Sequence, residues 1–443
     1  MLIKKRYTLN INESASDDFI INGGVLVKYQ NQFEKNVVIP DGVDIIGERA
    51  FRNMDNIEIV VMPECVTDIS DSAFDGCKKL KSINIPDGVK YIGGTAFCDC
   101  ENLESIDIPD GVNYIGGTTF KNCKKLKNII IPDSVKEIGN YAFCGCESFT
   151  TIKIPDDVKN IGDGMFYRCK NLITVEIPNF VTSIGYSAFE GCKKLKNITI
   201  PDNVTHIGYE AFKGCESLES INIHDGVEII ESRMFEGCKK LKTVIIPNSV
   251  KEIENSVFRN CKSLKSITIP KSVEKISYDV FYGCTRLTSI NMPILVETDN
   301  TIFGGGVNLK KFNGANISSM DDLRFVRCQY GSYKKMILPD EEFMHDEIHG
   351  EECYFKYIES YYNDFIIAVY SDMKREVFDM NFNSLTDGVR LVEILDIYDE
   401  YPVAVREDGK QMFLGHPKYK GQWFDECYTD MKGNMYIDGK KVN

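Results

Sequence analysis

The sequence predicts a mainly β repeat solenoid, and two observations lead to this prediction. Twelve segments of 23 residues follow one another without an insertion. Proline marks the same position in eleven of them, at Pro40, Pro63, Pro86, Pro109, Pro132, Pro155, Pro178, Pro201, Pro247, Pro270 and Pro293, and His224 fills the remaining slot. A phenylalanine follows eleven residues later every time, from Phe51 to Phe281. A fixed period of this length indicates units that bury their apolar faces only by stacking on one another.

The first half of each unit predicts a short strand and a turn. In the unit that begins at Cys77, Ile83 and Ile85 flank the polar Asn84, and this period of two is typical of a half-buried strand. Pro86 ends the strand because proline has no amide hydrogen to donate to a sheet. The Asp-Gly pair that follows favours a turn.

The second half of the unit predicts two weaker elements. Val89 and Ile92 begin an extended or turn-like stretch that Gly93 interrupts. The spacing of Phe97 and Cys100 suits a single turn of 3₁₀- or α-helix. When the units stack, the apolar positions face inward. Burying each of these side chains stabilises the fold by about 1.5–3 kcal/mol relative to leaving it exposed. In this unit they are Leu80, Ile83, Ile85, Val89, Ile92, Ala96, Phe97 and Cys100.

The repeated pattern LxxIxIPxxVxxIxxxAFxxCxxL resembles the BspA-like class of leucine-rich repeats over residues 38 to about 303. The segment from Asp18 to Val43 is similar to the lead-in hairpin that often precedes such repeats. The resemblance implies a right-handed curved array with a parallel sheet on its concave face. It also implies a binding or adhesion role, commonly at the surface of bacteria or parasitic protozoa.

These observations divide the chain into three parts. We expect an N-terminal cap over residues 1–37, a solenoid of twelve repeats over 38–305 and a small β-rich C-terminal domain of unknown family over 306–443. The regular pattern fails after Pro293, since Phe303 arrives one residue early and the cysteine is missing. In the C-terminal part, Asp408-Gly409 predicts a hairpin turn, and a second hairpin is expected around Gly433.

Composition limits the partners and the location. The net charge of −14 argues against nucleic acid as a partner, because phosphate binding requires a basic face. No run approaches 18 apolar residues, so we expect no membrane span. The N-terminal residues lack the apolar core of a secretory signal peptide. This favours a cytoplasmic location, with the cell surface or secretion by a non-standard route as the alternative that the family resemblance suggests.

Ten of the sixteen cysteines occupy one column of the repeat, from Cys77 to Cys284. We expect them to be free, buried thiols, because a column of small apolar residues requires no covalent bond. Disulfides between adjacent turns remain the alternative, since turns about 4.8 Å apart lie within bonding range. Cys98 and Cys144 lie outside this column, and we expect both to face solvent.

The candidate binding surface is the varied column of the predicted concave strand. A neighbouring column, from Ser82 to Ser289, is uniformly small and polar and suits a tightly curved face. The varied column would hold the specificity of a binding protein, and in it Ile130 and Ile245 are the apolar candidates for contact. Its members are Asn84, Asp107, Ile130, Lys153, Glu176, Thr199, Asn222, Ile245, Thr268 and Asn291. Isolated surface isoleucines are also ordinary.

Charged residues between each cysteine and the next strand alternate in sign from repeat to repeat. Lysines such as Lys193, Lys194 and Lys196 precede Glu216 and Glu219, and the same alternation recurs along the array. Neighbouring turns of opposite charge attract weakly, by roughly 0.2–1 kcal/mol per pair. We interpret the alternation as a device for register and solubility, with a polyanion site as the alternative.

No motif predicts an enzyme, a cofactor or a metal site. The histidine–cysteine spacing of His345, His349 and Cys353 suits a metal site only on a helix, and Gly350 interrupts one there. We find no nucleophile–base pair, phosphate loop or dinucleotide fingerprint. The leading hypothesis is therefore a non-enzymatic protein that binds another protein or other macromolecule. The alternative is a passive repeat spacer that presents an enzymatic or effector C-terminal domain.

Overall fold

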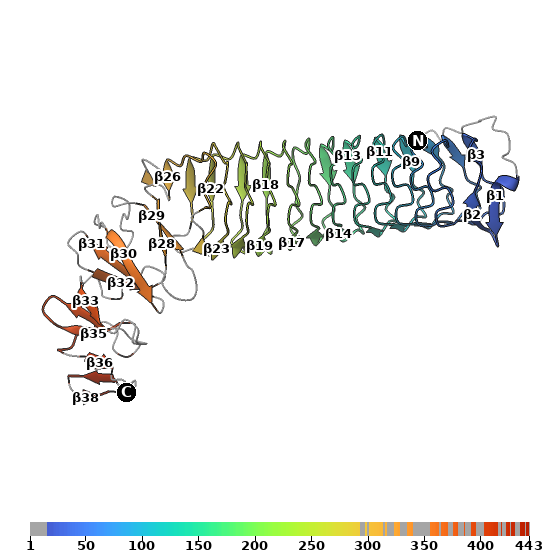
Figure 1. Ribbon diagram of the computed structural model, residues 1–443. Coiled ribbons are helices and arrows are strands. Elements are labelled where there is room, and N and C mark those ends of the chain that lie inside the picture. Colours follow the sequence, from blue (N-terminus) through green and yellow to red (C-terminus); the bar gives the residue numbers. More distant parts are fainter. Residues whose placement is uncertain are drawn as a thin grey trace. The chain divides into compact units, whose positions relative to one another are not determined.

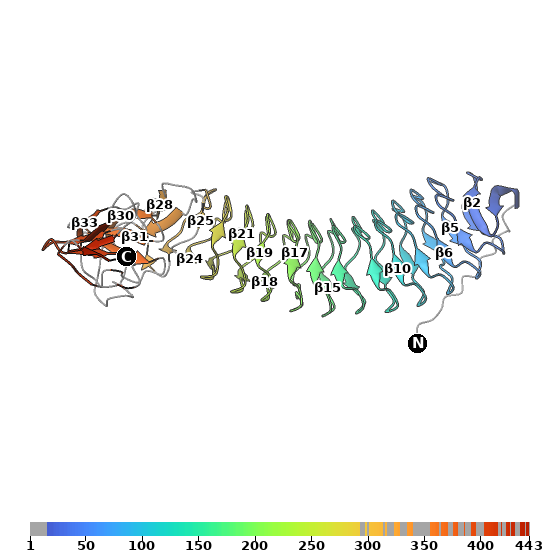
Figure 2. The same ribbon diagram turned by 90° about the horizontal axis from the view of Figure 1, so that it is seen from below.

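The computed structural model contains two compact units, Met1–Pro293 with Asp299–Asn308, and Ile294–Thr298 with Leu309–Asn443. The structure describes residues 16–292, 297–298, 301–312 and 315–316. In the C-terminal part it describes residues 323–327, 335–339, 355–362, 365–370, 375–379, 385, 391–395, 403–414, 418, 422–425, 427–429, 435–438 and 440–442. The first unit is the predicted solenoid, in which the turns stack in a bowed row (Figures 1 and 2).

The predicted strand forms a first ladder of parallel strands on one side of the solenoid, except in one repeat, where residues 197–199 form no strand. It runs in short stretches, with successive strands in register, as where Asn128 pairs with Ser105. Its strands are β3 (Asn36–Val38), β5 (Ile59–Val61), β7 (Ser82–Ile83), β9 (Ser105–Asp107), β11 (Asn128–Ile130), β13 (Thr151–Lys153), β15 (Thr174–Glu176), β18 (Ser220–Asn222), β20 (Thr243–Ile245), β22 (Ser266–Thr268) and β24 (Ser289–Asn291).

The weaker stretch of each repeat forms a second parallel ladder, which is the longer of the two without interruption. The order β1-β2-β4-β6-β8-β10-β12 is one sheet, followed by β14-β16-β17 and by a run through β19, β21 and β23. Its strands are β4 (Ile45–Ile46), β6 (Asp68–Ile69), β8 (Tyr91–Ile92), β10 (Tyr114–Ile115), β12 (Glu137–Ile138), β14 (Asn160–Ile161), β16 (Ser183–Ile184), β17 (His206–Ile207), β19 (Ile229–Ile230), β21 (Glu252–Ile253) and β23 (Lys275–Ile276). The stretch that the sequence predicted to be extended or turn-like is therefore a strand in these repeats.

The third side of each repeat consists of tight turns and contains no helix. Cys98 and Cys100 donate amide hydrogens to the carbonyl groups of Thr95 and Phe97, as in a 3₁₀-turn. Thr95 and Asp99 have φ values of 54° and 58°, and these left-handed residues prevent a continuous right-handed helix. The predicted single helical turn is therefore present as isolated 3₁₀-type turns and does not extend into a helix.

The core contains a continuous column of phenylalanine rings. The rings of Phe97, Phe120 and Phe143 stack with centroids 5.6 and 5.7 Å apart and planes within 3° of parallel. Each of the eight apolar positions predicted to face inward in the repeat that begins at Cys77 is buried. Since each ring covers the next, a phenylalanine is fully buried only when both neighbouring turns are present.

The predicted cap is an antiparallel hairpin of β1 (Phe19–Asn22) and β2 (Val25–Tyr29), preceded by the short 3₁₀-helix η1 (Ser16–Asp18). Strand β2 pairs in parallel with β4 and so continues the second ladder. The Tyr29 ring lies 5.2 Å from the Phe51 ring and closes the end of the phenylalanine column.

The second unit contains small β-sheets. Strands β30 to β35 form one six-stranded sheet and β36 to β38 form a three-stranded sheet. Gly409, with φ of 83°, lies in the predicted turn between β34 and β35. Its strands are β25 (Glu297–Thr298), β26 (Lys311–Phe312), β27 (Ala315–Asn316), β28 (Leu323–Arg327), β29 (Lys335–Pro339), β30 (Phe355–Tyr362), β31 (Phe365–Tyr370), β32 (Arg375–Asp379), β33 (Leu391–Leu395), β34 (Val403–Arg406), β35 (Gln411–Phe413), β36 (Cys427–Thr429), β37 (Met435–Ile437) and β38 (Lys440–Lys441).

The ten column cysteines are free thiols, and each makes the same contact. Cys77 Sγ donates to the Phe51 carbonyl oxygen at 3.0 Å, and Cys284 Sγ donates to that of Phe258 at 3.0 Å. The eight cysteines between them do the same, at 3.1–3.3 Å, to the phenylalanine of the preceding turn. Burial raises the pKa of the Cys77 and Cys284 thiols to about 12, which keeps them protonated as donors.

The expectation that Cys98 and Cys144 face solvent was wrong. Their side chains are 8% and 7% exposed, and burial raises the pKa of both thiols, that of Cys98 to about 12. The exposed free cysteine among the described residues is Cys65.

We predict that a thiol reagent at neutral pH labels Cys65 rapidly and leaves the column from Cys77 to Cys284 unmodified until the protein unfolds. The reagent reacts with thiolates, and both burial and the raised pKa suppress them in the column. Peptide mapping by mass spectrometry identifies the labelled positions, and Cys65→Ser is the control. Rapid labelling of Cys123 or Cys146 in the native protein would contradict the buried arrangement.

A chain of ion pairs connects several turns on the third side. Lys213 lies 2.7 Å from Glu210 and 3.7 Å from Glu190, and Arg233 contacts Glu210 at 3.2 Å. The chain comprises Glu190, Lys213, Glu210, Arg233, Glu236, Arg259 and Asp279. Burial opposes ionisation of Glu210, but hydrogen bonds from Lys213 and Arg233 outweigh it and lower the pKa of the Glu210 carboxyl group.

We predict that Glu210→Gln lowers the free energy of unfolding by about 1 kcal/mol at pH 7. Because the pKa of Glu210 is lower in the folded state, its contribution is complete above the unfolded value of about 4.3 and is lost as the pH falls through the folded value. The difference between wild type and variant should therefore shrink below pH of about 4. Denaturant titrations at several pH values measure it. The exposed Glu64→Gln is the control, and a difference independent of pH would contradict the ionic origin.

Candidate functional site

The predicted varied column lies on the first ladder, and all ten of its members are exposed. Ile130 and Ile245 are 69% and 62% exposed, whereas their neighbour Ile129 faces the core at 7%. The assignment of the two strand faces is therefore right. A role for this column in binding stays a prediction.

Three members of the varied column also have structural contacts, and one of them is Asn222, whose Nδ2 lies 3.5 Å from His224 Nε2. The Asn84 side chain accepts a hydrogen bond from the Met62 amide at 2.8 Å and donates to the Met62 carbonyl at 3.2 Å. Lys153 Nζ lies 3.7 Å from an Asp133 carboxylate oxygen. Asn84 therefore extends the backbone ladder towards the N-terminal end.

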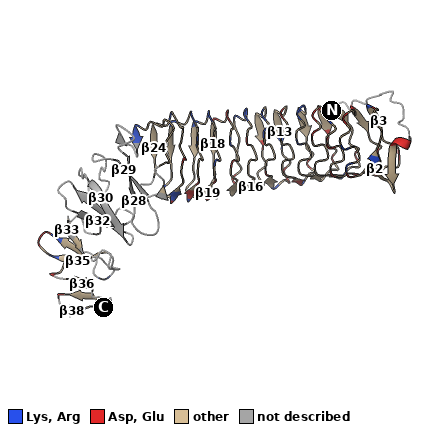
Figure 3. Cartoon of the chain, in the orientation of Figure 1, with Lys and Arg blue, Asp and Glu red and all other residues tan. Residues whose placement is uncertain are grey.

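The alternating charges between turns form ion pairs, as predicted. Lys239 and Lys193 lie 3.0 and 3.2 Å from opposite oxygens of Glu216. Lys196 and Lys242 flank Glu219 in the same way, at 3.8 and 2.7 Å. The lysines are thus neutralised by the neighbouring turns, and charges of both signs are interspersed along the solenoid (Figure 3).

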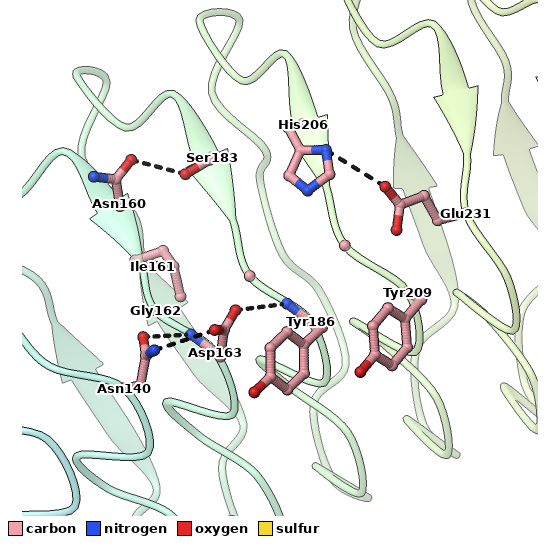
Figure 4. Close-up of a pocket in the computed structure, with 12 residues that line it drawn as sticks. Asn140, Asn160, Ile161, Gly162, Asp163, Ser183, Tyr186, His206, Tyr209 and Glu231 are labelled. Atoms are coloured by element: carbon pink, nitrogen blue, oxygen red, sulfur yellow. Dashed lines mark hydrogen bonds and ion pairs between the residues drawn. The ribbon is translucent and has the colours of Figure 1, made fainter.

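The structure places a groove, which the sequence did not predict, over β14, β16 and β17 of the second ladder (Figure 4). Its volume is about 440 Å³, and it extends from the turn of Asn140 to the turn of Glu231. These three strands form the middle run of the second ladder, between two interruptions in strand pairing. The groove therefore lies where the ladder is locally irregular.

Two rows of side chains form the walls of the groove, and glycines lie between them. The first residues of the three strands, Asn160, Ser183 and His206, form one wall, and Glu231 lies at the end. The opposite wall and the intervening glycines are Asn140, Asp163, Tyr186, Tyr209, Gly162, Gly185 and Gly208.

The glycines between the walls are required by close approach of the backbone. A Cβ atom on Gly185 would lie 2.6 Å from the Asp163 amide nitrogen, and one on Gly208 would lie 2.6 Å from the Tyr186 amide nitrogen. Real Cβ atoms do not approach so closely, so glycine follows first from packing. A consequence is that no side chain fills the space between the two walls.

Hydrogen bonds hold the wall residues in place. Asp163 accepts from Asn140 Nδ2 at 3.1 Å and from the Tyr186 amide at 3.2 Å, while Asn140 Oδ1 accepts from the Asp163 amide at 3.0 Å. On the other wall, Ser183 Oγ donates to Asn160 Oδ1 at 2.7 Å. The polar surface of the groove is thus largely preorganised.

Three tyrosines gather beside the groove. The rings of Tyr186 and Tyr209 stack with centroids 5.1 Å apart and planes 2° from parallel, and the Tyr141 ring approaches Tyr186 edge-on at 6.2 Å. The Tyr141 ring occupies the space above Gly164, where a Cβ atom would lie 2.1 Å from a ring carbon. Because Gly164 has no side chain, there is room for the tyrosine cluster.

A signal for the groove existed in the sequence. Glycine occupies one column of six successive repeats, at Gly93, Gly116, Gly139, Gly162, Gly185 and Gly208, and glutamate replaces it at Glu231 and Glu254. The end of this glycine column marks the end of the groove. The side-chain chemistry of the walls could not be assigned to one surface without knowing that the weaker stretch is a strand.

One cluster of side chains has the chemistry of metal ligands. Asp75, Cys98 and Asp99 come close enough to offer three ligand atoms within 4.8 Å of one another. However, Asp75 pairs with Arg52 at 3.0 Å and Asp99 accepts from Asn122 at 2.8 Å. His345, His349 and Cys353 lie outside the described residues. None of the helical segments in the described part of the chain has the length and hydropathy needed to cross a bilayer.

Comparison with known proteins identifies the repeat. A family model described as BspA type leucine-rich repeat region matches residues 28–146, 118–242 and 205–331, which together make up more than half of the chain. The chain belongs to this family. The family assignment therefore agrees with the parallel β solenoid. The family is defined by its repeat and not by a catalytic activity.

Solved structures resemble this BspA-type protein. A leucine-rich repeat protein from Bacteroides ovatus is 35% identical, with a TM-score of 0.56, over 65% of this chain and 81% of its own. A leucine rich cell surface protein from Faecalibacterium prausnitzii is 29% identical, with a TM-score of 0.42, over 62% of this chain and 92% of its own. A search of curated proteins finds no match.

Proposed function

We propose that this BspA-type protein is a non-enzymatic binding protein of the adhesion type, which contacts another protein through the first ladder. The observation that supports the proposal is the varied, exposed column of side chains on the repeat array. It brings equivalent positions of successive turns into one surface, so a partner can contact several repeats at once.

The chemistry of this column favours a protein partner. Ile130 and Ile245 offer exposed apolar contacts at two separated turns, while Asp107, Lys153 and Glu176 offer charges of both signs. A mixed surface of this kind suits a protein interface, in which a few apolar anchors contribute most of the binding energy. The net negative charge of the chain disfavours nucleic acid.

We also propose exposure at a cell surface. The cytoplasmic expectation rests on the N-terminal sequence, and the comparisons give it no support. The Faecalibacterium relative is named a cell surface protein, and the family resemblance suggests the same location. Antibody labelling of intact cells tests this, and signal seen only after permeabilisation would contradict it.

We predict that Ile130→Asp and Ile245→Asp each weaken binding to the protein partner by roughly thirty-fold or more, about 2 kcal/mol, because each buries an unpaired carboxylate in the contact. Proteins captured on the immobilised full-length chain are compared between wild type and variants by quantitative mass spectrometry. Affinity is then measured for each protein lost from the variants. Thermal unfolding should be unchanged, since both positions are exposed.

The matched control is Ile229→Asp, which makes the same change at a residue 43% exposed on the second ladder. It should leave capture unchanged. Loss of the same partner in this control, with no loss in the first-ladder variants, would move the site to the second ladder. If no captured protein depended on either ladder, the passive spacer would be the better description of the array.

A further inference from the structure

We propose that the groove over β14, β16 and β17 binds an extended neutral oligosaccharide. This site lies on the second ladder, and it is independent of the proposed protein contact on the first ladder. Four features of the groove lead to this inference, namely its shape, its hydrogen-bonding groups, its tyrosines and its charge.

The groove follows the solenoid axis, and its spacing suits a sugar chain. The equivalent wall residues Asn160, Ser183 and His206 belong to successive turns, and the stacked rings of Tyr186 and Tyr209 give a turn-to-turn spacing of 5.1 Å (Figure 4). This spacing is close to the length of one pyranose unit in an extended chain. Successive sugars can therefore meet equivalent positions of successive turns.

The walls offer both donors and acceptors for hydroxyl groups. Asn160 uses Oδ1 to accept from Ser183, which leaves its Nδ2 group as a donor for a ligand. The carboxylate of Glu231, close to His206 at 3.5 Å, accepts hydrogen bonds, and so does that of Asp163. Sugar hydroxyls donate and accept at once, so they match a lining that combines amides, a hydroxyl and carboxylates.

Tyr209 supplies an aromatic face at the end of the groove. Its ring is 46% exposed, and Tyr186 covers only one of its faces. The next residue in this column is Ser232, whose small side chain provides no third ring. The C–H face of a pyranose packs well on such a ring. The carboxylate of the neighbouring Glu231 can accept hydrogen bonds from the hydroxyl groups of the same sugar.

The charge of the groove selects against other ligands. Asp163 and Glu231 are both acidic, and the groove lining contains no lysine or arginine. Phosphorylated, sulfated or uronic-acid chains would therefore be repelled. Ile161 is 1% exposed, so the groove also lacks an accessible apolar pocket that could anchor a hydrophobic peptide side chain. A basic peptide is the competing ligand, and its binding would depend on salt.

The test uses the full-length protein and neutral oligosaccharides of about six units, long enough for the five turns at about 4.8 Å each. The probes are cello-, manno-, xylo-, laminari-, malto- and chito-oligosaccharides, measured by calorimetry and saturation-transfer NMR. At least one should bind with a dissociation constant of about 1 mM or tighter. The affinity should change less than about twofold between low salt and about 0.5 M salt, because the ligand is uncharged.

Tyr209→Ala and Glu231→Gln should each weaken that binding at least about tenfold. The matched control is Tyr91→Ala, since Tyr91 stacks on Tyr114 at 5.0 Å on the same ladder outside the groove. Ile245→Asp, on the first ladder, is the second control. Neither control should change sugar binding, and circular dichroism checks the fold of all four variants.

Three results would overturn the proposal. They are failure of every oligosaccharide to bind, equal loss in Tyr91→Ala and Tyr209→Ala, or binding of a hexalysine peptide but of no sugar. None of these outcomes depends on the partner of the first ladder. Failure of the oligosaccharide site and failure of the proposed protein contact are therefore distinguishable.

Discussion

The requirement that each turn cover the next governs the rest of this structure. The phenylalanine column is buried because its rings stack from turn to turn, and the cap ring of Tyr29 continues it. The thiol of each column cysteine donates to the carbonyl of the phenylalanine in the preceding turn, as Cys123 does to Phe97 at 3.2 Å. A cysteine is small enough to be fully buried and still supplies this weak donor. The free thiols of the solenoid are thus part of its packing.

Surface charge follows the same constraint. Equivalent residues of adjacent turns are neighbours, so like charges in one column would repel, whereas Lys193, Glu216 and Lys239 attract in sequence. On the third side of the turns, the ion pair of Glu210 and Arg233 likewise joins opposite charges of adjacent turns. Charges of opposite sign therefore stabilise the contact between adjacent turns along these two columns.

Departures from regularity are where recognition is expected. The first ladder varies one exposed column of side chains, which suits a protein contact. On the second ladder, Gly164 admits the Tyr141 ring and Glu231 ends the glycine column. A column of varied side chains and a space left by missing side chains are different ways of creating a site. The two ladders can therefore serve different ligands.

The sequence by itself determined the period, the strand of the first ladder and the inward positions, because each depends on contacts that repeat every 23 residues. The capping hairpin was expected only from the family resemblance. The sequence did not determine that the stretch around Ile161 is a strand, since two residues carry too little periodicity and pairing arises only between turns. Nor did it determine that Cys98 is buried or that Thr95 adopts a left-handed conformation. The groove is tertiary for the same reason. Asn140, Asp163 and Tyr186 are 23 residues apart in sequence, and only stacking brings them together.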